Sequence, residues 1–291
     1  MPGASALRLA RPDGPTEFEK VAGPFLVARE AENNLILGLT SMLKAGRSYG
    51  AATYFGVVRD GEPVVGAAMR AGLYLIVTAG TTDAALRMLV DDAVRVTADA
   101  PGIVGPKELA RKAVVRWTSL TGQQATLQMA ERIYSLSRVT APRPVDGRMR
   151  AAGSEDLELV ATWLHAFAVE AQPHLFATAA DARANAERWI AHGGLKLWQD
   201  GAVVSMAGAS GPTPNGIRIG AVYTPPEKRG RGYASALVAA ISQEQLDAGR
   251  KFCFLYTDLA NPTSNKIYQA IGYEAVSDVD QYGFTPTRAQ S

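Results

Sequence analysis

The sequence predicts a two-domain α/β protein in which each domain has a mixed, mainly antiparallel sheet flanked by helices. The chain has 291 residues, about twice the length of a common domain. Strand patterns joined by short turns alternate with helical patterns, and the same order of patterns occurs in both halves. A stretch near the middle, TAPRPVDGRMR, contains two prolines and a glycine and reads as a linker. We therefore expect domains at residues 1–140 and 150–291, joined by a linker at 141–149.

The composition favours a globular protein that needs no polyanionic partner. Apolar residues make up 47% and charged residues 20% of the chain. With 30 Lys and Arg against 28 Asp and Glu, the net charge is +2, which argues against a nucleic-acid partner. The most apolar stretch, residues 64–80, is interrupted by Arg70 and is too short to span a membrane. The first residues lack the apolar core of a secretory signal, so a cytoplasmic protein without a membrane partner is expected.

Cysteine and histidine are scarce, which limits the chemistry available. The only cysteine, Cys253, lies between two phenylalanines in a strand pattern, where a buried apolar role is expected. With one cysteine and three histidines in the chain, we expect no metal site. Hydroxyls, carboxylates, backbone groups or an organic cosubstrate should therefore carry the reaction.

The first half shows a helix, a hairpin, a strand and a helix, at residues 29–44, 54–70, 73–78 and 83–98. The hairpin turns at Asp60-Gly61, a dipeptide that favours a tight turn. A basic segment, KELARKAVVRW at residues 107–117, could bind nucleic acid, but the balanced charge of the chain favours a solvated helix face.

The second half can be divided more fully. A helix is expected after Ser154, which would cap it, and another at 181–191, ending at Gly193. Further elements follow in order: strands at 195–199, 202–210 and 217–224, a helix at 232–248, a strand at 251–257, a helix at 261–272 and closing strands at 273–279 and 281–284. Asp200-Gly201 turns the first hairpin, as Asp60-Gly61 does in the first half, and the matching order favours a duplication.

The most informative segment is VYTPPEKRGRGYAS, where a strand ends and a basic, glycine-rich loop opens a helix. Glycines allow the backbone N–H groups to converge, and the N-terminus of a helix favours an anion, so the loop suits a phosphate or diphosphate. A Walker A loop is excluded because no Gly-Lys-Ser/Thr follows. A Rossmann fingerprint fits poorly, because Ser235 stands where Gly or Ala belongs. The pattern R-x-x-G-x-A is met by Arg229, Gly232 and Ala234.

This pattern resembles the GNAT superfamily of acyl-CoA-dependent N-acyltransferases, whose signature is Arg/Gln-x-x-Gly-x-Gly/Ala. A second block, ANPTSNKIYQAIGYEAV, is similar to the usual end of that family. Its matching residues are Asn261, Ser264, Tyr268, Gly272 and Tyr273, the last with Tyr for the usual Phe. The resemblance covers residues 148–285. The first half shares the element order but lacks the loop, so it resembles a degenerate repeat or an accessory domain.

The resemblance implies acetyl-CoA as cosubstrate, no metal, and a set of contacting residues. Backbone N–H groups of the loop would hold the diphosphate, and main-chain groups of the preceding strand would pair with pantetheine. The implied cofactor contacts are Val222, Thr224, Arg229, Gly230, Arg231, Gly232, Tyr233, Ala234, Asn261, Ser264 and Tyr268. The backbone N–H near Val222 would stabilise the oxyanion, and Tyr268 would protonate the leaving thiolate.

The base and the acceptor contacts are left open by the sequence. Glu170, His174 and Asp258 are alternative bases, with Glu170 taken as the first choice. Acceptor contacts are expected from Gln172, Tyr223 and Tyr282. In the first half, Asp83 stands where a cation would be wanted, so no CoA is expected there.

The function expected from the resemblance is an N-acetyltransferase that moves an acetyl group from acetyl-CoA to a primary amine, on a small molecule or a peptide. Transfer would be direct, without a covalent enzyme intermediate. The alternative is a non-catalytic protein that binds CoA as a sensor or structural element. A third reading, transfer from aminoacyl-tRNA, is disfavoured by the balanced charge.

Overall fold

The chain forms two compact units in a computed structural model that describes residues 7–49, 53–72, 74–171 and 178–285. The first unit comprises Met1–Ile133, Gly211–Pro214 and Val276–Ser291, and the second comprises Tyr134–Ser210 and Asn215–Ala275. The segment 141–149, expected as a linker, therefore falls inside the second unit. Within this segment Asp146 O accepts from Trp198 Nε1 (2.9 Å), and just before it Thr140 N–H donates to Ile271 O (2.9 Å).

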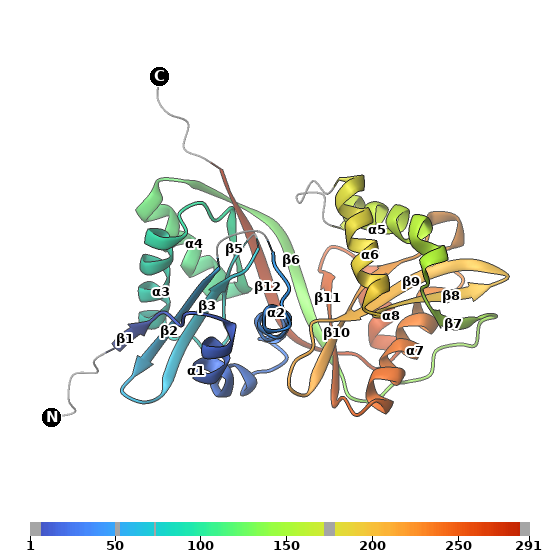
Figure 1. Ribbon diagram of the computed structural model, residues 1–291, viewed down its shortest axis with the longest axis horizontal. Helices are drawn as coiled ribbons and strands as arrows, with labels where there is room; N and C mark the ends of the chain where they lie inside the picture. The colour runs from blue at the N-terminus through green and yellow to red at the C-terminus, as the bar shows by residue number, and fades with distance from the viewer. Residues whose placement is uncertain (1–6, 50–52, 73, 172–177, 286–291) are drawn as a thin grey trace, which may run out of the picture. The chain divides into compact units, whose positions relative to one another are not determined.

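The first unit is a sheet with helices on both faces (Figure 1). Its strands are β1 (Leu7–Ala10), β2 (Tyr54–Asp60), β3 (Val64–Arg70), β4 (Leu75–Val77), β5 (Gly102–Pro106), β6 (Gln124–Leu136) and β12 (Glu274–Thr285), in the order β1-β2-β3-β4-β5-β12-β6. Its helices are α1 (Pro15–Val27), α2 (Asn34–Lys44), α3 (Asp83–Val96) and α4 (Lys107–Thr121). Tyr54 and Val58 pack with α3 and α4, whereas Phe55 meets Phe18 of α1 on the other face (5.1 Å).

The second unit repeats this arrangement. Its strands are β7 (Arg148–Ala151), β8 (Leu195–Asp200), β9 (Ala202–Ser210), β10 (Gly216–Tyr223) and β11 (Phe252–Asp258), together with the end of β6, in the order β6-β11-β10-β9-β8-β7. Its helices are α5 (Leu157–Ala171), α6 (Ala179–Ala191), α7 (Tyr233–Asp247) and α8 (Pro262–Ala270), and a short 3₁₀ turn, Ser154–Asp156, precedes α5. One core lies between the sheet and α7, and another between the sheet and α5 and α6.

Among the strand pairs whose register the described residues define, β4 with β5 and β10 with β11 are parallel, one pair in each unit, and the others are antiparallel. The hairpin turns also correspond, since Gly61 and Gly201 have φ values of 64° and 65°. The expected mixed, mainly antiparallel sheets and their tandem arrangement are confirmed. The last strands are exchanged between the repeats: β12 lies beside β5 in the first unit, and β6 lies beside β11 in the second.

Several expected elements differ from the structure. The helix expected at 29–44 begins at Asn34. No helix was expected over Pro15–Val27, where α1 lies; Pro15 occupies its first turn, where the missing N–H is harmless. Ser154 does not cap α5, because the side chain of Asp156 bonds to Gly153 N (2.8 Å) and a 3₁₀ turn leads into the helix. The two closing strands are one strand, β12.

Among the described residues, no helix combines the length and apolar character that crossing a membrane requires. In the same part of the chain, no group of three or more His, Cys, Asp and Glu side chains is placed to hold a metal ion.

Candidate functional site

The loop before α7 has the backbone conformation that its glycines predict. Gly230 and Gly232 have φ values of 77° and 87°, in the left-handed region that favours glycine. The first backbone bond of α7 runs from Ala236 N–H to Gly232 O (3.0 Å). The N–H groups before Ala236 therefore lie at the helix start, where no turn precedes them to accept their bonds. Gly230, Arg231 and Gly232 are exposed, so this end of α7 is open to an anion.

Strand β10, which leads to the loop, is irregular near its end. Gly220 pairs with Gly208 of β9 and Tyr223 with Met206, so two residues of β10 oppose one residue of β9. Between them Ala221 has φ 50°, the single positive value among the described non-glycine residues. This is a β-bulge, which bends the strand and takes its extra residue out of regular pairing. Val222 lies in the bulge, at the position expected to face the thioester.

Strands β10 and β11 pair over a short stretch and then separate. Their parallel register runs from Gly216 with Phe252 to Arg218 with Phe254, although β10 continues to Tyr223 and β11 to Asp258. Beyond Arg218 and Phe254, the residues of β10 and β11 therefore no longer pair with one another. An opening of this kind leaves main-chain groups of β10 available to an extended ligand, as the resemblance implied for Val222 and Thr224.

Ser205 of β9 holds the end of β10 and was not identified from the sequence. Its fully buried hydroxyl bonds to Tyr223 O (3.1 Å) and to Thr224 Oγ1 (2.9 Å). A buried hydroxyl needs partners, and here both come from the residues that follow the bulge. Ser205 therefore fixes the direction in which the chain enters the loop.

Arg229 is engaged by protein groups rather than extended toward solvent. Its Nε donates to Thr224 O (2.8 Å), its Nη2 donates to Glu170 Oε2 (2.7 Å), and its guanidinium lies over the Tyr223 ring (5.8 Å from the centroid). The ring of Tyr223 in turn packs against Trp163 of α5 (5.9 Å). Burial and the neighbouring Glu170 carboxylate raise the pKa of Tyr223. Arg229 thus joins the loop to the end of α5.

Helix α8 presents Tyr268 beside the core of the second unit. The ring of Tyr268 is half-buried and meets Tyr273 edge-on (6.1 Å), and burial raises the pKa of Tyr268 to about 12. Asn261 caps α8, with its Oδ1 accepting from Ser264 N (3.1 Å). Both residues are therefore placed by the start and the last turn of one short helix.

Asn265 anchors α8 and was also missed by the sequence analysis. Its Nδ2 donates to Asp258 O (3.2 Å) and Asn261 O (2.9 Å). Its Oδ1 accepts from the hydroxyls of Tyr134 (3.2 Å) and Thr257. These four bonds satisfy the whole amide and tie α8 to the ends of β6 and β11, which positions Tyr268.

The candidate bases and acceptor contacts are in different environments. Glu170 is nearly half exposed, and its carboxylate is paired with the guanidinium of Arg229. Asp258 is exposed and its Oδ1 accepts from Ala260 N (2.8 Å). Tyr282 belongs to the first unit, where its hydroxyl donates to Asp280 (3.3 Å). His174 and Gln172 lie outside the described residues.

Comparison with known proteins supports the interpretation of this region. The FR47-like protein family matches residues 199–282, which include the bulge, the loop and Tyr268. No curated protein matches the chain at a significant level. Three solved acetyltransferases are similar over nearly the whole chain. The GCN5-related N-acetyltransferase from Sphaerobacter thermophilus is 15% identical, with TM-score 0.59, and the match covers 95% of this chain and 94% of that one.

A GNAT-family acetyltransferase from Colwellia psychrerythraea is 14% identical (TM-score 0.56, 96% of this chain and 100% of that one). A tandem GNAT protein from the clavulanic acid biosynthesis pathway is also 14% identical (TM-score 0.56, 98% and 100%). The chain has a tandem GNAT acetyltransferase fold. The resemblance stated from the loop and the Tyr268 block is thereby confirmed.

Within the first GNAT-fold unit, the segment that corresponds to the loop is bonded by the chain itself. The side chain of Asn33 accepts from Ala79 N (2.9 Å) and donates to Leu26 O (3.1 Å). Thr82 caps α3 by accepting from Ala85 N (3.3 Å). Asp83 follows in the first turn and pairs with Lys112. A side-chain cap and a carboxylate thus occupy the helix start that an anion would need.

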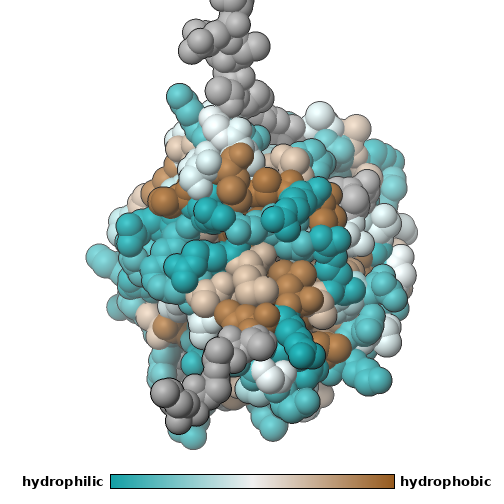
Figure 2. All heavy atoms as spheres, turned by 90° about the vertical axis from the view of Figure 1, so that its left-hand side faces the viewer, coloured by the Kyte–Doolittle hydropathy of each residue, from teal (hydrophilic) through white to brown (hydrophobic). Residues whose placement is uncertain are grey.

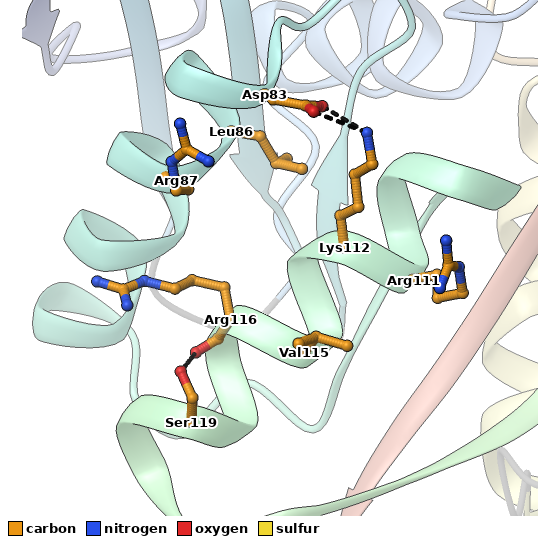
Figure 3. Close-up of a pocket in the computed structure, with 8 residues that line it drawn as sticks. All are labelled: Asp83, Leu86, Arg87, Arg111, Lys112, Val115, Arg116 and Ser119. Atoms are coloured by element: carbon orange, nitrogen blue, oxygen red, sulfur yellow. Dashed lines mark hydrogen bonds and ion pairs between the residues drawn. The ribbon is translucent and has the colours of Figure 1, made fainter.

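A groove between α3 and α4 of the first unit is distinct from the loop (Figure 3). It is lined by Asp83, Leu86, Arg87, Arg111, Lys112, Val115, Arg116 and Ser119. Three of its cations are already paired, Arg111 with Glu108, Lys112 with Asp83 and Arg116 with Asp91. Seen from the side of β1 and α3, hydrophobic atoms gather in patches separated by a hydrophilic band (Figure 2). These paired cations fit the solvated helix face expected for residues 107–117.

Proposed function

We propose that the second unit transfers an acetyl group from acetyl-CoA to a primary amine. The observation that carries this proposal is the junction at the end of β10. There a bulged strand that has separated from β11 leads directly into the loop at Gly230–Gly232 and the start of α7. One elongated ligand with a diphosphate at one end and an acyl group at the other would use both features.

The residues fit acetyl-CoA. In the described part of the chain, no heavy atom would lie within 4 Å of a Cβ at Gly230, so the space beside the loop is open there. The N–H groups of Arg231, Gly232, Tyr233 and Ala234 would hold the diphosphate, with Arg231 adding charge. Main-chain groups of Val222 and Thr224 would bond to pantetheine, and Asn261 and Ser264 would contact it from α8. Arg229 would contribute to cofactor binding indirectly, because its side chain holds the carbonyl of Thr224 in place.

In the reaction, the amine nitrogen forms a bond to the acyl carbon and the bond between that carbon and sulfur breaks. The N–H near Val222 would stabilise the oxyanion between these steps. The phenol of Tyr268 would give its proton to the thiolate, and the proton lost by the amine would leave through water. Because burial raises the pKa of Tyr268 to about 12, the phenol is protonated at neutral pH and has a proton to donate.

The buried environment of the chain's one cysteine agrees with direct transfer. Cys253 is fully buried, and its thiol donates weakly to Ser242 O (3.7 Å). Burial raises the pKa of Cys253 to about 12, so the thiolate that nucleophilic attack requires is disfavoured. An acyl-cysteine intermediate is therefore not part of the proposal.

Calorimetry with acetyl-CoA and a thiol-release assay across a panel of amines test this function. Binding of acetyl-CoA followed by amine-dependent release of CoA is the expected result. Binding without thiol release for any amine would favour a CoA sensor, and no binding at millimolar acetyl-CoA would overturn both. Tight, salt-sensitive binding of tRNA would instead favour transfer from aminoacyl-tRNA.

A further inference from the structure

Arg218 of β10 has a buried nitrogen that lacks a partner. Its Nη1 is inaccessible to solvent and has no hydrogen-bond partner among the described residues, although the side chain as a whole is only half-buried. A guanidinium presents donors in a rigid planar fork, and leaving a buried donor unpaired is costly. Unpaired buried donors of this kind are uncommon in folded proteins, so this one calls for an explanation.

The strand register shows which face of the sheet Arg218 occupies. Gly220 is opposite Gly208, and a Cβ at Gly208 would meet the ring of Trp189 from α6 at 2.5 Å. Both glycines therefore face α5 and α6. Because side chains alternate along a strand, Arg218 lies on the same face as Gly220, two residues away. This is also the face on which Arg229 contacts Tyr223.

On this face the position of Gly220 is open among the residues that the structure describes. A Cβ at Gly220 would have none of their heavy atoms within 4 Å, in contrast to the glycines around it. At Gly216 a Cβ would meet the ring of Phe254 at 2.4 Å, and at Gly208 it would meet Trp189. Gly220 thus forms the floor of a gap in the sheet face. Along β10 the gap is bordered by Arg218 before it and by the bulge after it.

The gap leads toward the expected position of the thioester. Val222 follows Arg218 by four residues, so their Cα atoms are at most about 13 Å apart at about 3.3 Å per residue. The side chain of Arg218 can reduce the distance to the reacting carbon by several ångström. A small molecule with its amine at the thioester could therefore place a second group on Arg218.

We propose that Arg218 binds a carboxylate of the acceptor, so that the acceptor is an amine that also carries a carboxylate, as amino acids and short peptides do. This inference rests on the proposed acetyl transfer and names its substrate class. A carboxylate offers two oxygens in the plane of the guanidinium fork, which is the geometry that Arg recognises best. It would occupy the gap over Gly220, and because Nη1 is closed to solvent in the unliganded chain, the guanidinium would turn toward the gap so that Nη1 pairs with the carboxylate.

A thiol-release assay with acetyl-CoA and matched acceptors tests the assignment. The acceptors are ω-amino acids of two to six carbons, alanyl-alanine, and the amide of each. In the wild type, kcat/KM should be higher for each acid than for its amide, with a maximum at one chain length. Arg218→Gln should lower kcat/KM for the best acid about 10- to 100-fold, as expected for loss of a charge-assisted bond, and leave the amide within about twofold. Arg148→Gln, which changes an exposed arginine of β7, should alter neither.

A second variant and a binding measurement keep the test independent of turnover. Gly220→Leu fills the gap without backbone strain and should abolish transfer to the acids while acetyl-CoA still binds. In the presence of CoA, the N-acetylated acid should bind to the wild type and not to Arg218→Gln. Equal kcat/KM for acids and amides, or equal losses for both in Arg218→Gln, would overturn the assignment and leave acetyl transfer standing. A protein that fails to bind acetyl-CoA before any acceptor is added would overturn the proposed function itself.

Discussion

The guanidinium of Arg229 donates to the carboxylate of Glu170 across 2.7 Å and so connects the loop before α7 with the last turn of α5. Both side chains are nearly half exposed, at 48% and 46%, and exposed pairs contribute only about 0–1 kcal/mol to stability. The importance of this pair is therefore geometric: it keeps Arg229 against the carbonyl of Thr224, at the point where β10 ends.

Replacing Glu170 by Gln tests whether this residue positions Arg229 or acts as the base. We expect the KM for acetyl-CoA to rise about two- to tenfold while kcat stays within about threefold, because one exposed charged contact is lost. Steady-state kinetics with the best acceptor measure both constants. Glu158→Gln is the matched control, since Glu158 lies on the same helix and pairs with Arg183 instead. A hundredfold fall in kcat would assign the base to Glu170, because general base catalysis is worth at least that factor.

Gly232→Ala should weaken the binding of acetyl-CoA. Gly232 has φ 87°, and a Cβ there would lie 3.0 Å from Val145 Cγ1, so the loop must shift to admit it. A left-handed conformation costs an alanine about 1–2 kcal/mol. Gly249→Ala carries a similar strain at φ 91°, in an exposed turn after α7 with open space around it. Calorimetry should give a Kd at least tenfold higher for Gly232→Ala only, while both variants lose similar stability. Equal CoA affinities in the two variants would contradict a role for the loop.

Tyr268→Phe should lower kcat about a hundredfold and leave the Kd for acetyl-CoA within about twofold, as loss of a general acid does. Because its pKa is raised to about 12, the phenol stays protonated throughout the usual assay range. The pH profile of kcat up to pH 10 should therefore keep its shape in the variant and fall only in height. An alkaline limb that is present in the wild type and lost in Tyr268→Phe would show that the phenol titrates lower.

Tyr273→Phe is the control for that variant. The Tyr273 hydroxyl bonds to Ser242 (2.8 Å) inside the core, so its removal should reduce stability by about 1 kcal/mol and leave kcat unchanged.

Asp156→Asn should reduce stability in a pH-dependent way. Arg150 donates twice to this buried carboxylate (2.6 and 2.7 Å), and these hydrogen bonds, together with the bond from Gly153, lower the pKa of Asp156 below its usual 3.8. A lowered pKa stabilises the fold above the value of the unfolded chain and loses that effect as pH falls through the folded value. We expect a loss of about 1.5–3 kcal/mol near pH 7 that shrinks below pH 3.8.

Chemical denaturation from pH 7 to pH 3 measures this difference. Asp247→Asn makes the same chemical change at an exposed position near the end of α7 and should have little effect at any pH. A loss of stability that is equal at pH 7 and pH 3 would contradict the ionic origin of the Asp156 effect.

Local signals in the sequence predicted most of the second unit. The glycines predicted to form turns, Gly193, Gly201 and Gly272, all have positive φ. Helix α7 begins after Gly232 and helix α8 after Asn261, as the sequence predicts. Strand β6 was missed because most of its first half is exposed, so it shows no alternation. Its place in the sheet depends on partners far away in the chain, for example Asp278, which pairs with Arg132 across 146 residues.

The candidate site was predicted where it depends on one continuous segment. The loop from Arg229 to Ala234 and the block from Asn261 to Tyr268 could be predicted from local sequence motifs. Contacts between segments could not: Arg229 meets Glu170 only because α5 lies over β10, and Ser205 supports Thr224 through pairing of β9 with β10. The unpaired nitrogen of Arg218 depends on which side chains fail to reach it, which no sequence pattern records.

The exchange of β6 and β12 bears on how the protein can be divided into parts for experiments. The chain passes between the two units after Ile133, Ser210, Pro214 and Ala275, so neither unit is one continuous stretch. A gene fragment encoding residues 150–291 would omit Tyr134–Leu136 and carry a final strand whose neighbour β5 is missing. Neither repeat can therefore be expressed alone together with the strand that completes its own sheet.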